Sequence, residues 1–457
     1  MASERSWPRR PALWRWHFYA GLFCVPFVLW LSVTGGVYLF RPQVEAWLDA
    51  PYRGLARTRP AAAPSAQVAA AVAAVPGAVF HRYQLPEAPG DAAQVIVGHG
   101  RAETRVYVHP QSLAILARVD EDSRPMRIVF RLHGELLAGD AGSYLVELAA
   151  SWAIIMLVSG LLLWWPHGGG LAGVVYPRLG RGRRAMWRDL HAVTGFWVSA
   201  MALFLLLSGL PWAKSWGGYL KAVRSVAEGP VKQDWSSGQA AMLAERAAFD
   251  AGTRAMMNDH AEHQGMTMAH PPGDEHPLDR LVPVVAAQRL APPVLIAPPT
   301  APGQPWTAKS DAANRPLRSD LTLTADGRIL GRRDFAGRKL VDRLVGWGVA
   351  IHEGQAFGWA NQLLNLLTAL GLMLLSVSSV VLWLRRRPAG RLGAPPPRPR
   401  PGFARGFGVL LVLLGVLLPL FGLSLLAVLL VERLVLRRWP AARIWLGLPP
   451  PGIVSPA

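Results

Sequence analysis

The chain has 457 residues, of which 51% are hydrophobic, and it carries 19 tryptophans and a formal net charge of +19. This composition is typical of a membrane protein with sizeable polar domains and argues against a wholly soluble protein. The charge does not indicate a nucleic-acid partner, because the basic residues gather beside apolar runs, where they mark the cytoplasmic side of a membrane. A single cysteine, Cys24, excludes disulfides within the chain and Cys-based zinc or iron–sulfur sites.

Apolar runs of membrane-spanning length alternate with polar regions along the chain. The Arg-rich stretches that flank these runs place the N-terminus and the connecting loops in the cytoplasm. The predicted segments are a cytoplasmic N-terminus (1–16), a first span (17–40), an outer domain (41–143), a second span (144–166), a cytoplasmic loop (167–188), a third span (189–212), a second outer domain (213–360), a fourth span (361–384), a basic cytoplasmic linker (385–405), a fifth span (406–432) and a C-terminal tail (433–457).

The fifth apolar run allows two topologies. One crossing would put Arg433, Arg437 and Arg438 outside, against the charge rule, whereas a hairpin at Pro419 would return them to the cytoplasm. A single span is the prediction.

Each outer region is predicted to be a small α+β domain. The first contains alternating, strand-like stretches on both sides of residues 98–103. The second contains Asp326-Gly327 between two strand-like stretches, which is a hairpin signal.

The sequence repeats itself in two registers. A shift of 174 positions lays His17 on His191, and the same shift matches Gly21 with Gly195, Thr34 with Ser208 and Gly35 with Gly209. A shift of 219 positions lays His133 on His352, Gly139 on Gly358 and Trp164 on Trp383. The pattern predicts an α-helical membrane protein built by internal duplication. Because each repeat holds an even number of spans, an axis along the membrane normal should relate the halves.

The two matched histidine pairs carry the chemistry. An ionisable side chain near a bilayer costs free energy, so such histidines are candidates for function, although each could instead reach the headgroups or bond a backbone carbonyl. Two neutral imidazoles can face each other across a haem iron, which closes the coordination sphere and favours electron transfer. Pairing His17 with His191 and His133 with His352 would give one haem on each side of the membrane.

A different group of ligands lies in residues 256–276. Thioethers and imidazoles suit Cu(I), and neighbouring carboxylates would admit zinc or iron; a disordered polar loop is the alternative. The candidate metal ligands are His260, His263, Met266, Met268 and His270.

The motifs around the four histidines resemble the PepSY-associated transmembrane family of bacterial inner-membrane proteins. The matching segments are WRWHFYAGLF, FRLHGELLAG, WRDLHAVTGFW and VAIHEGQAFG, with spans ending LLLWWP and VVLWL. The resemblance implies two periplasmic PepSY-like domains and two bis-histidine haem b groups on His17, His133, His191 and His352. It also implies reduction of ferric siderophores in the periplasm. The Met/His segment departs from the simplest pattern of the family.

The leading hypothesis is therefore a haem-dependent oxidoreductase of the inner membrane that reduces periplasmic ferric iron, bound to a siderophore. No flavin or nicotinamide motif is evident, so a quinol or a partner reductase would supply electrons. No catalytic residue is assigned. Two alternatives stay open: a non-redox membrane protein that binds peptides or regulates a periplasmic peptidase, and a protein that handles copper or another metal through residues 256–276.

Overall fold

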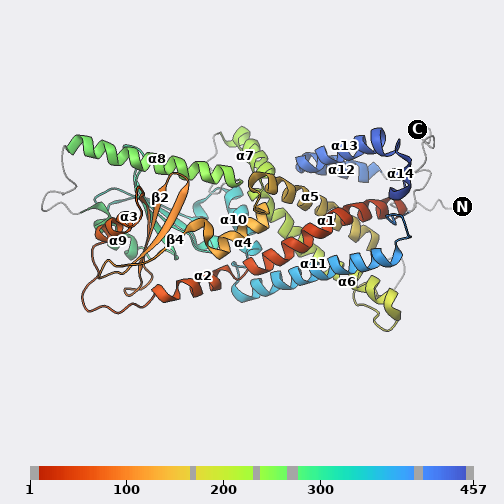
Figure 1. Ribbon diagram of the computed structural model, residues 1–457, viewed down its shortest axis with the longest axis horizontal. Helices are drawn as coiled ribbons and strands as arrows, with labels where there is room; N and C mark the ends of the chain where they lie inside the picture. Colours follow the sequence, from red (N-terminus) through yellow and green to blue (C-terminus); the bar gives the residue numbers. More distant parts are fainter. Residues whose placement is uncertain (1–9, 165–170, 230–236, 265–275, 396–404, 449–457) are drawn as a thin grey trace. The chain divides into compact units, whose positions relative to one another are not determined.

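The computed structural model describes residues 10–164, 171–229, 237–264, 276–395 and 405–448 (Figure 1). The chain forms two compact units, each built from segments distant in sequence. The first, here the helical unit, comprises Met1–Val37, His133–Lys232 and Leu363–Ala457, and the second, here the sheet unit, comprises Tyr38–Leu132 and Gln233–Gln362.

The helical unit contains all or most of eight described helices. They are α1 (Arg10–Tyr38), α5 (Gly139–Trp164), α6 (Gly182–Gly209), α7 (Lys214–Glu228), α11 (Gly358–Arg386), α12 (Arg405–Leu417), α13 (Pro419–Val431) and α14 (Pro440–Leu446). Long apolar segments become helices because hydrocarbon offers no partner for an unpaired backbone group. Five stretches are long and apolar enough to cross a membrane: Leu13–Tyr38, Gly139–Trp164, Gly182–Trp212, Gly358–Arg386 and Pro419–Leu436. The chain is thus a multi-pass membrane protein.

The membrane helices pack in two similar pairs, α1 on α5 and α6 on α11. A Cβ placed on Gly21 would lie 3.8 Å from the sulfur of Met156, and one on Gly195 would lie 3.4 Å from Leu375 Cδ2. These positions correspond under the two sequence shifts. A Cβ on Gly371 would lie only 2.5 Å from Val198 Cγ1, so glycine is what lets α11 approach α6 closely.

Both α5 and α11 begin at a glycine in the left-handed region. The φ angle is +59° at Gly139 and +60° at Gly358, a conformation that glycine adopts without the Cβ penalty of other residues. Each follows a shorter helix that carries one of the outer histidines, α4 (Pro125–Glu135) and α10 (Leu340–His352).

The fifth apolar run is two helices rather than one continuous helix over 406–432, and its single crossing of the membrane stays a prediction. Leu418 separates α12 from α13 with a non-helical φ of −121° and ψ of 81°. The residue before a proline is disfavoured in the helical region, and Pro419 lacks the N–H needed to continue the ladder. The two helices turn back on each other: a Cβ on Gly422 would lie 2.7 Å from the carbonyl oxygen of Gly415. They lie side by side in Figure 1.

The sheet unit contains one antiparallel sheet of eight strands, in the order β4-β3-β2-β1-β5-β6-β7-β8. The strands are β1 (Val79–Gln84), β2 (Ala93–His99), β3 (Ala102–Val108), β4 (Ile115–Asp120), β5 (Val294–Ala297), β6 (Trp306–Ser310), β7 (Ser319–Leu323) and β8 (Ile329–Asp334). Where the sequence predicts two α+β domains, β1 and β5 pair and join four strands from each into one sheet. Tyr83 is opposite Ile296 and Gln84 opposite Leu295.

Two matching helices cover this sheet. Helix α3 (Pro64–Ala73) precedes the first four strands and α9 (Pro277–Ala287) precedes the second four. Their apolar side chains form one core with alternate strand residues, such as Val95 and Ile296, which are fully buried. The hairpin predicted at Asp326-Gly327 is confirmed between β7 and β8, and Gly327 has a φ of +92°.

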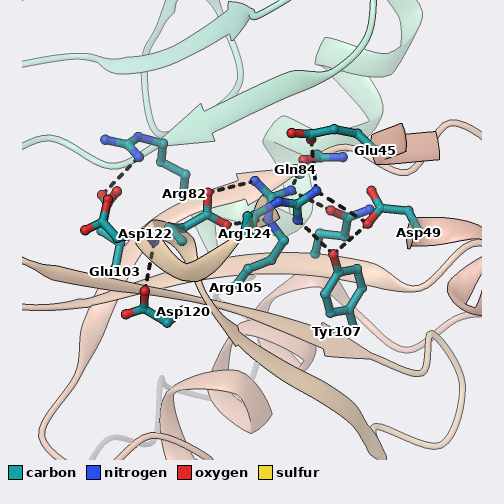
Figure 2. A network of polar contacts seen from close by, with 12 residues as sticks. Glu45, Asp49, Arg82, Gln84, Glu103, Arg105, Tyr107, Asp120, Asp122 and Arg124 are labelled. Atoms are coloured by element: carbon teal, nitrogen blue, oxygen red, sulfur yellow. Dashed lines mark hydrogen bonds and ion pairs between the residues drawn. The ribbon is translucent and has the colours of Figure 1, made fainter. Parts of the chain in front are cut away.

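A polar network fixes the start of α4 and the end of α2 (Arg41–Asp49) to β3 (Figure 2). Arg124, directly before α4, donates to the Tyr107 hydroxyl at 3.0 Å and to Glu45 at 2.9 Å. Tyr107 in turn donates to Asp49 at 2.7 Å. Such charge-assisted bonds set orientation as well as adding stability. The network thereby holds the first turn of α4 against the sheet.

A second buried cluster attaches α8 (Gln239–Gln264) to β1 and β3. His81 is fully buried, with Nδ1 3.0 Å from Glu103 and Nε2 3.3 Å from Asp250 of α8. Arg82 and Arg246 also contact Glu103, at 3.0 and 3.1 Å. Burial disfavours the charged carboxylate, but the His81 hydrogen bond and the two arginines outweigh it and hold the pKa of Glu103 at about 2.

Candidate functional site

The candidate site in the helical unit centres on His17 of α1. Its Nδ1 lies 3.0 Å from the carbonyl oxygen of Met156 and 3.1 Å from Ser159 Oγ, both on α5. A carbonyl oxygen can only accept a hydrogen bond, so Nδ1 carries the proton. The Ser159 hydroxyl donates to Met156 at 2.9 Å, so its oxygen is also placed to accept from the ring. Nε2 therefore keeps its lone pair and is the nitrogen that could bind a metal.

His191 has the same surroundings on the other helix pair. Its Nδ1 lies 3.3 Å from the carbonyl oxygen of Leu375 and 3.1 Å from Ser378 Oγ on α11, and the Ser378 hydroxyl donates to Leu375 at 3.0 Å. Leu375 and Ser378 stand 219 positions after the two partners of His17. The same reasoning puts the proton of His191 on Nδ1 and leaves the lone pair on Nε2, the nitrogen that could bind a metal.

His17 and His191, both part-buried, lie within electrostatic range of each other. Sequence alone could match the two histidines but could not show that their rings come within this range.

His133 repeats the pattern with a hydroxyl in place of a carbonyl. Its Nδ1 lies 3.0 Å from Thr34 Oγ1 of α1. The Thr34 hydroxyl lies 2.9 Å from the carbonyl oxygen of Trp30, to which it donates its only proton, so the His133 ring donates to it.

His352 is the last residue of α10 and belongs to the sheet unit, whereas His133 belongs to the helical unit. The pairing of His133 with His352 around one centre stays a prediction. So do the roles of all four histidines as cofactor ligands.

Glycines press against two of the rings. A Cβ on Gly160 would lie 3.0 Å from His17 Cε1, and a Cβ on Gly35 would lie 3.0 Å from His133 Cε1. Any larger residue would push the ring from its place. With Nδ1 hydrogen-bonded and the ring packed against a glycine, His17 and His133 have the kind of support that a metal-bound histidine has, so these residues fit a haem iron.

The Met/His candidates lie outside what the structure describes. This holds for Met266, Met268 and His270, and for the side chains of His260 and His263 at the end of α8. His276 caps α9, where its Nδ1 accepts from the Leu278 amide at 3.1 Å. Within the described ranges, no group of three or more His, Cys, Asp or Glu side chains is arranged to hold a metal ion.

Ser159 and Ser378 are the site residues that sequence reasoning missed. They are related by the 219-residue shift, and each lies in a predicted span. Extending the self-comparison from the histidines to the polar residues of the spans would have found them.

Comparison with known families agrees with this arrangement. The family model for the PepSY-associated TM region matches residues 14–386, which includes all four histidines and both helix pairs. A comparison with curated proteins gave no match. The chain therefore belongs to the family defined by the PepSY-associated TM region.

Proposed function

We propose that this protein is a di-haem electron-transfer protein of the bacterial inner membrane, built by internal duplication. Its substrate would be ferric iron on the periplasmic side, held by a siderophore. His17 and His191 would hold one haem b, and His133 and His352 the other.

The observation that carries the proposal is the shared protonation of three histidines. Packing and hydrogen bonding commit Nδ1 of His17, His191 and His133 to donation, on residues of different helices. A histidine that only bonded a carbonyl or reached the headgroups would not need a second helix to hold its ring, nor a glycine against it. Three rings bonded through Nδ1, two of which also pack against a glycine, favour ligation over an anchoring role.

When bound, a bis-histidine haem supplies a one-electron carrier with no open coordination position. The chain's residues set the conditions for that carrier. Ser159 and Ser378 orient the two imidazoles, and the bonded Nδ1–H raises the basicity of the opposite nitrogen. The apolar helices around them lower the local dielectric and exclude water.

The charge distribution supports the sides of the membrane assigned to the two haems. Arg-rich segments favour a cytoplasmic location for the ends of α1 and α6 near His17 and His191, and the opposite side for His133 and His352. Electrons from a quinol or a partner reductase would then move outward. Reduction weakens iron binding by the hard oxygen ligands that suit Fe(III), which releases the metal.

An absorption spectrum of the purified protein, expressed with adequate haem, tests the proposal. We expect a Soret band and an α-band that appears with dithionite and is bleached by a ferric siderophore. Absence of both bands would remove the haem function and favour a non-redox role for the sheet unit. Haem that is present but never reoxidised by ferric siderophores would remove the substrate assignment.

A further inference from the structure

The chain continues beyond the family match, and this added part closes on the His17 end of the helical unit. The match ends at residue 386, whereas the described chain includes residues 387–395, the hairpin of α12 and α13, and α14. These segments contact the same turn of α1 that carries His17.

The first contact comes from the tip of the hairpin. The Trp152 indole N–H donates to Ser424 Oγ at 2.9 Å, and the Phe421 ring packs edge-on against Trp152 with centroids 5.0 Å apart. Phe421 is fully buried. Trp152 in turn stacks on Trp16, beside His17, at 6.3 Å. The hairpin therefore reaches the His17 turn through two aromatic rings.

The second contact comes from the segments on either side of the hairpin. Arg15 donates to the carbonyl oxygen of Pro395, and the Tyr19 hydroxyl donates to that of Leu446. The Leu392 amide donates to the carbonyl oxygen of Trp445 at 2.9 Å, which joins the chain before α12 to α14. The hairpin thus enters and leaves at the same end of the helical unit, the end where α1 begins.

The His191 turn is held in a different way. Asp189, which stands 174 positions after Arg15, is nearly fully buried and accepts from Arg178 at 2.7 Å and from Arg188 at 2.9 Å. The Arg178 bond comes from the loop before α6 and the Arg188 bond from α6 itself, both inside the family match. The two halves therefore use unrelated segments at equivalent places.

We propose that residues 387–395 and 405–448 form a strap that positions the His17 turn of α1 and closes it from the cytoplasmic side. In this arrangement Ser424, Phe421 and Tyr19 are positioning residues for His17. The path of the strap along the helical unit is independent of the proposed function. Its effect on a cofactor rests on that function.

A crosslink tests the path of the strap without any cofactor. A Cβ on Gly447 would lie 3.9 Å from the Cβ of Ala394, within the span of a disulfide. In a Cys24→Ala background, we expect the pair Ala394→Cys and Gly447→Cys to crosslink when isolated membranes are oxidised. The control pair, Leu417→Cys with Gly447→Cys, should not, because Leu417 lies at the hairpin turn.

Chemical labelling of single cysteines is a second test of the same path. Arg391 and Arg438 are both exposed and lie before and after the hairpin. We expect an impermeant maleimide to label Arg391→Cys and Arg438→Cys from the same side of the membrane. Labelling of the two cysteines from opposite sides of the membrane would overturn the strap. Failure of the Ala394/Gly447 crosslink would overturn it as well.

The positioning role is tested with Ser424→Ala and Tyr19→Phe, which each remove one hydrogen bond. We expect faster amide exchange in residues 14–19, and a shifted electron paramagnetic resonance signal for one haem centre only. Trp197→Phe is the matched control, since its indole bond to Val175 at 2.9 Å lies on α6.

Unchanged exchange at residues 14–19 in both variants would overturn the positioning role. Faster exchange in a protein that binds no haem would uphold the strap and refute the proposed function instead. The two claims therefore fail by different results.

Discussion

At the scale of single residues, the decisive feature is which nitrogen of each histidine carries the proton. In His17, His191 and His133, Nδ1 faces an oxygen that has no proton left to donate to the ring. The ring is therefore the donor in each of these hydrogen bonds. A hydroxyl that already donates to a carbonyl of its own helix acts as a fixed acceptor. Ser159, Ser378 and Thr34 all do so. Each of these hydroxyls thus fixes the tautomer of the histidine that donates to it.

Removing one such hydroxyl should weaken ligation without unfolding the protein. In Ser378→Ala, His191 keeps only the longer bond to Leu375, and outer-shell partners of this kind are worth about 10- to 100-fold in affinity. We expect a loss of that order in haem retention at one centre, measured by haem-to-protein ratio during dialysis against apomyoglobin. Ser376→Ala is the control, because the Ser376 hydroxyl bonds Leu372 of its own helix. Equal retention in the two variants would contradict the role of Ser378.

A substitution at Gly160 tests the packing of the ring. An added methyl group in Gly160→Ala would lie 3.0 Å from His17 Cε1 and must displace it. We expect a shifted redox potential for one centre and an unchanged potential for the other, by spectroelectrochemical titration. Gly218→Ala on α7 is the control, since nothing lies within 4 Å of its Cβ position. A wild-type titration curve for Gly160→Ala would show that the ring is not held at this place.

At the scale of elements, local sequence chemistry explains what could be predicted. The apolar runs and the Asp326-Gly327 hairpin both depend on residues close in sequence, and both are present. The division of the fifth run into α12 and α13 was not predicted, because hydropathy alone cannot distinguish one long helix from two short ones. Pro419 and the charge of Arg433, Arg437 and Arg438 pointed to a hairpin. In the structure, the Trp216 indole bonds the Leu417 carbonyl oxygen beside the turn, at 2.9 Å.

The union of the two outer domains could not be predicted from sequence. Pairing of β1 with β5 joins Tyr83 to Ile296 across more than two hundred residues, and nothing in either strand specifies that partner. An edge strand exposes unpaired backbone groups, and here each half covers the other's edge. Sequence patterns report alternation along a strand but not its neighbour.

The attachment of α8 to the sheet should depend on pH through Glu103. Its pKa falls from 4.5 to about 2 on folding, so its contribution to stability is present above about pH 4.5 and is lost as the pH falls toward 2. By the usual conversion this contribution is on the order of 3 kcal/mol. We expect amide exchange in α8 to rise over this range in the wild-type protein. In Glu103→Gln it should be high already at neutral pH. A pH-independent difference between the two proteins would contradict this assignment.

At the scale of the whole molecule, the two sequence shifts recur as physical contacts. The partners of His17 and His191 correspond one to one, and so do the glycines that begin α5 and α11. Trp164 and Trp383 each donate their indole N–H to a backbone carbonyl that follows the span, Val174 at 3.1 Å and Leu392 at 2.8 Å. These correspondences support the proposed duplication. Sequence comparison anticipated them because a repeated helix pair repeats its spacing, whereas the strap has no counterpart to reveal it.

The central claim is that four histidines hold two haems in two pairs, and haem stoichiometry in four single variants tests it most directly. We predict two haems per wild-type chain. His17→Ala and His191→Ala should each leave one haem with the same spectrum, and His133→Ala and His352→Ala should each leave the other. Full haem content in any of the four, or a different remaining centre in two variants of one pair, would contradict the account.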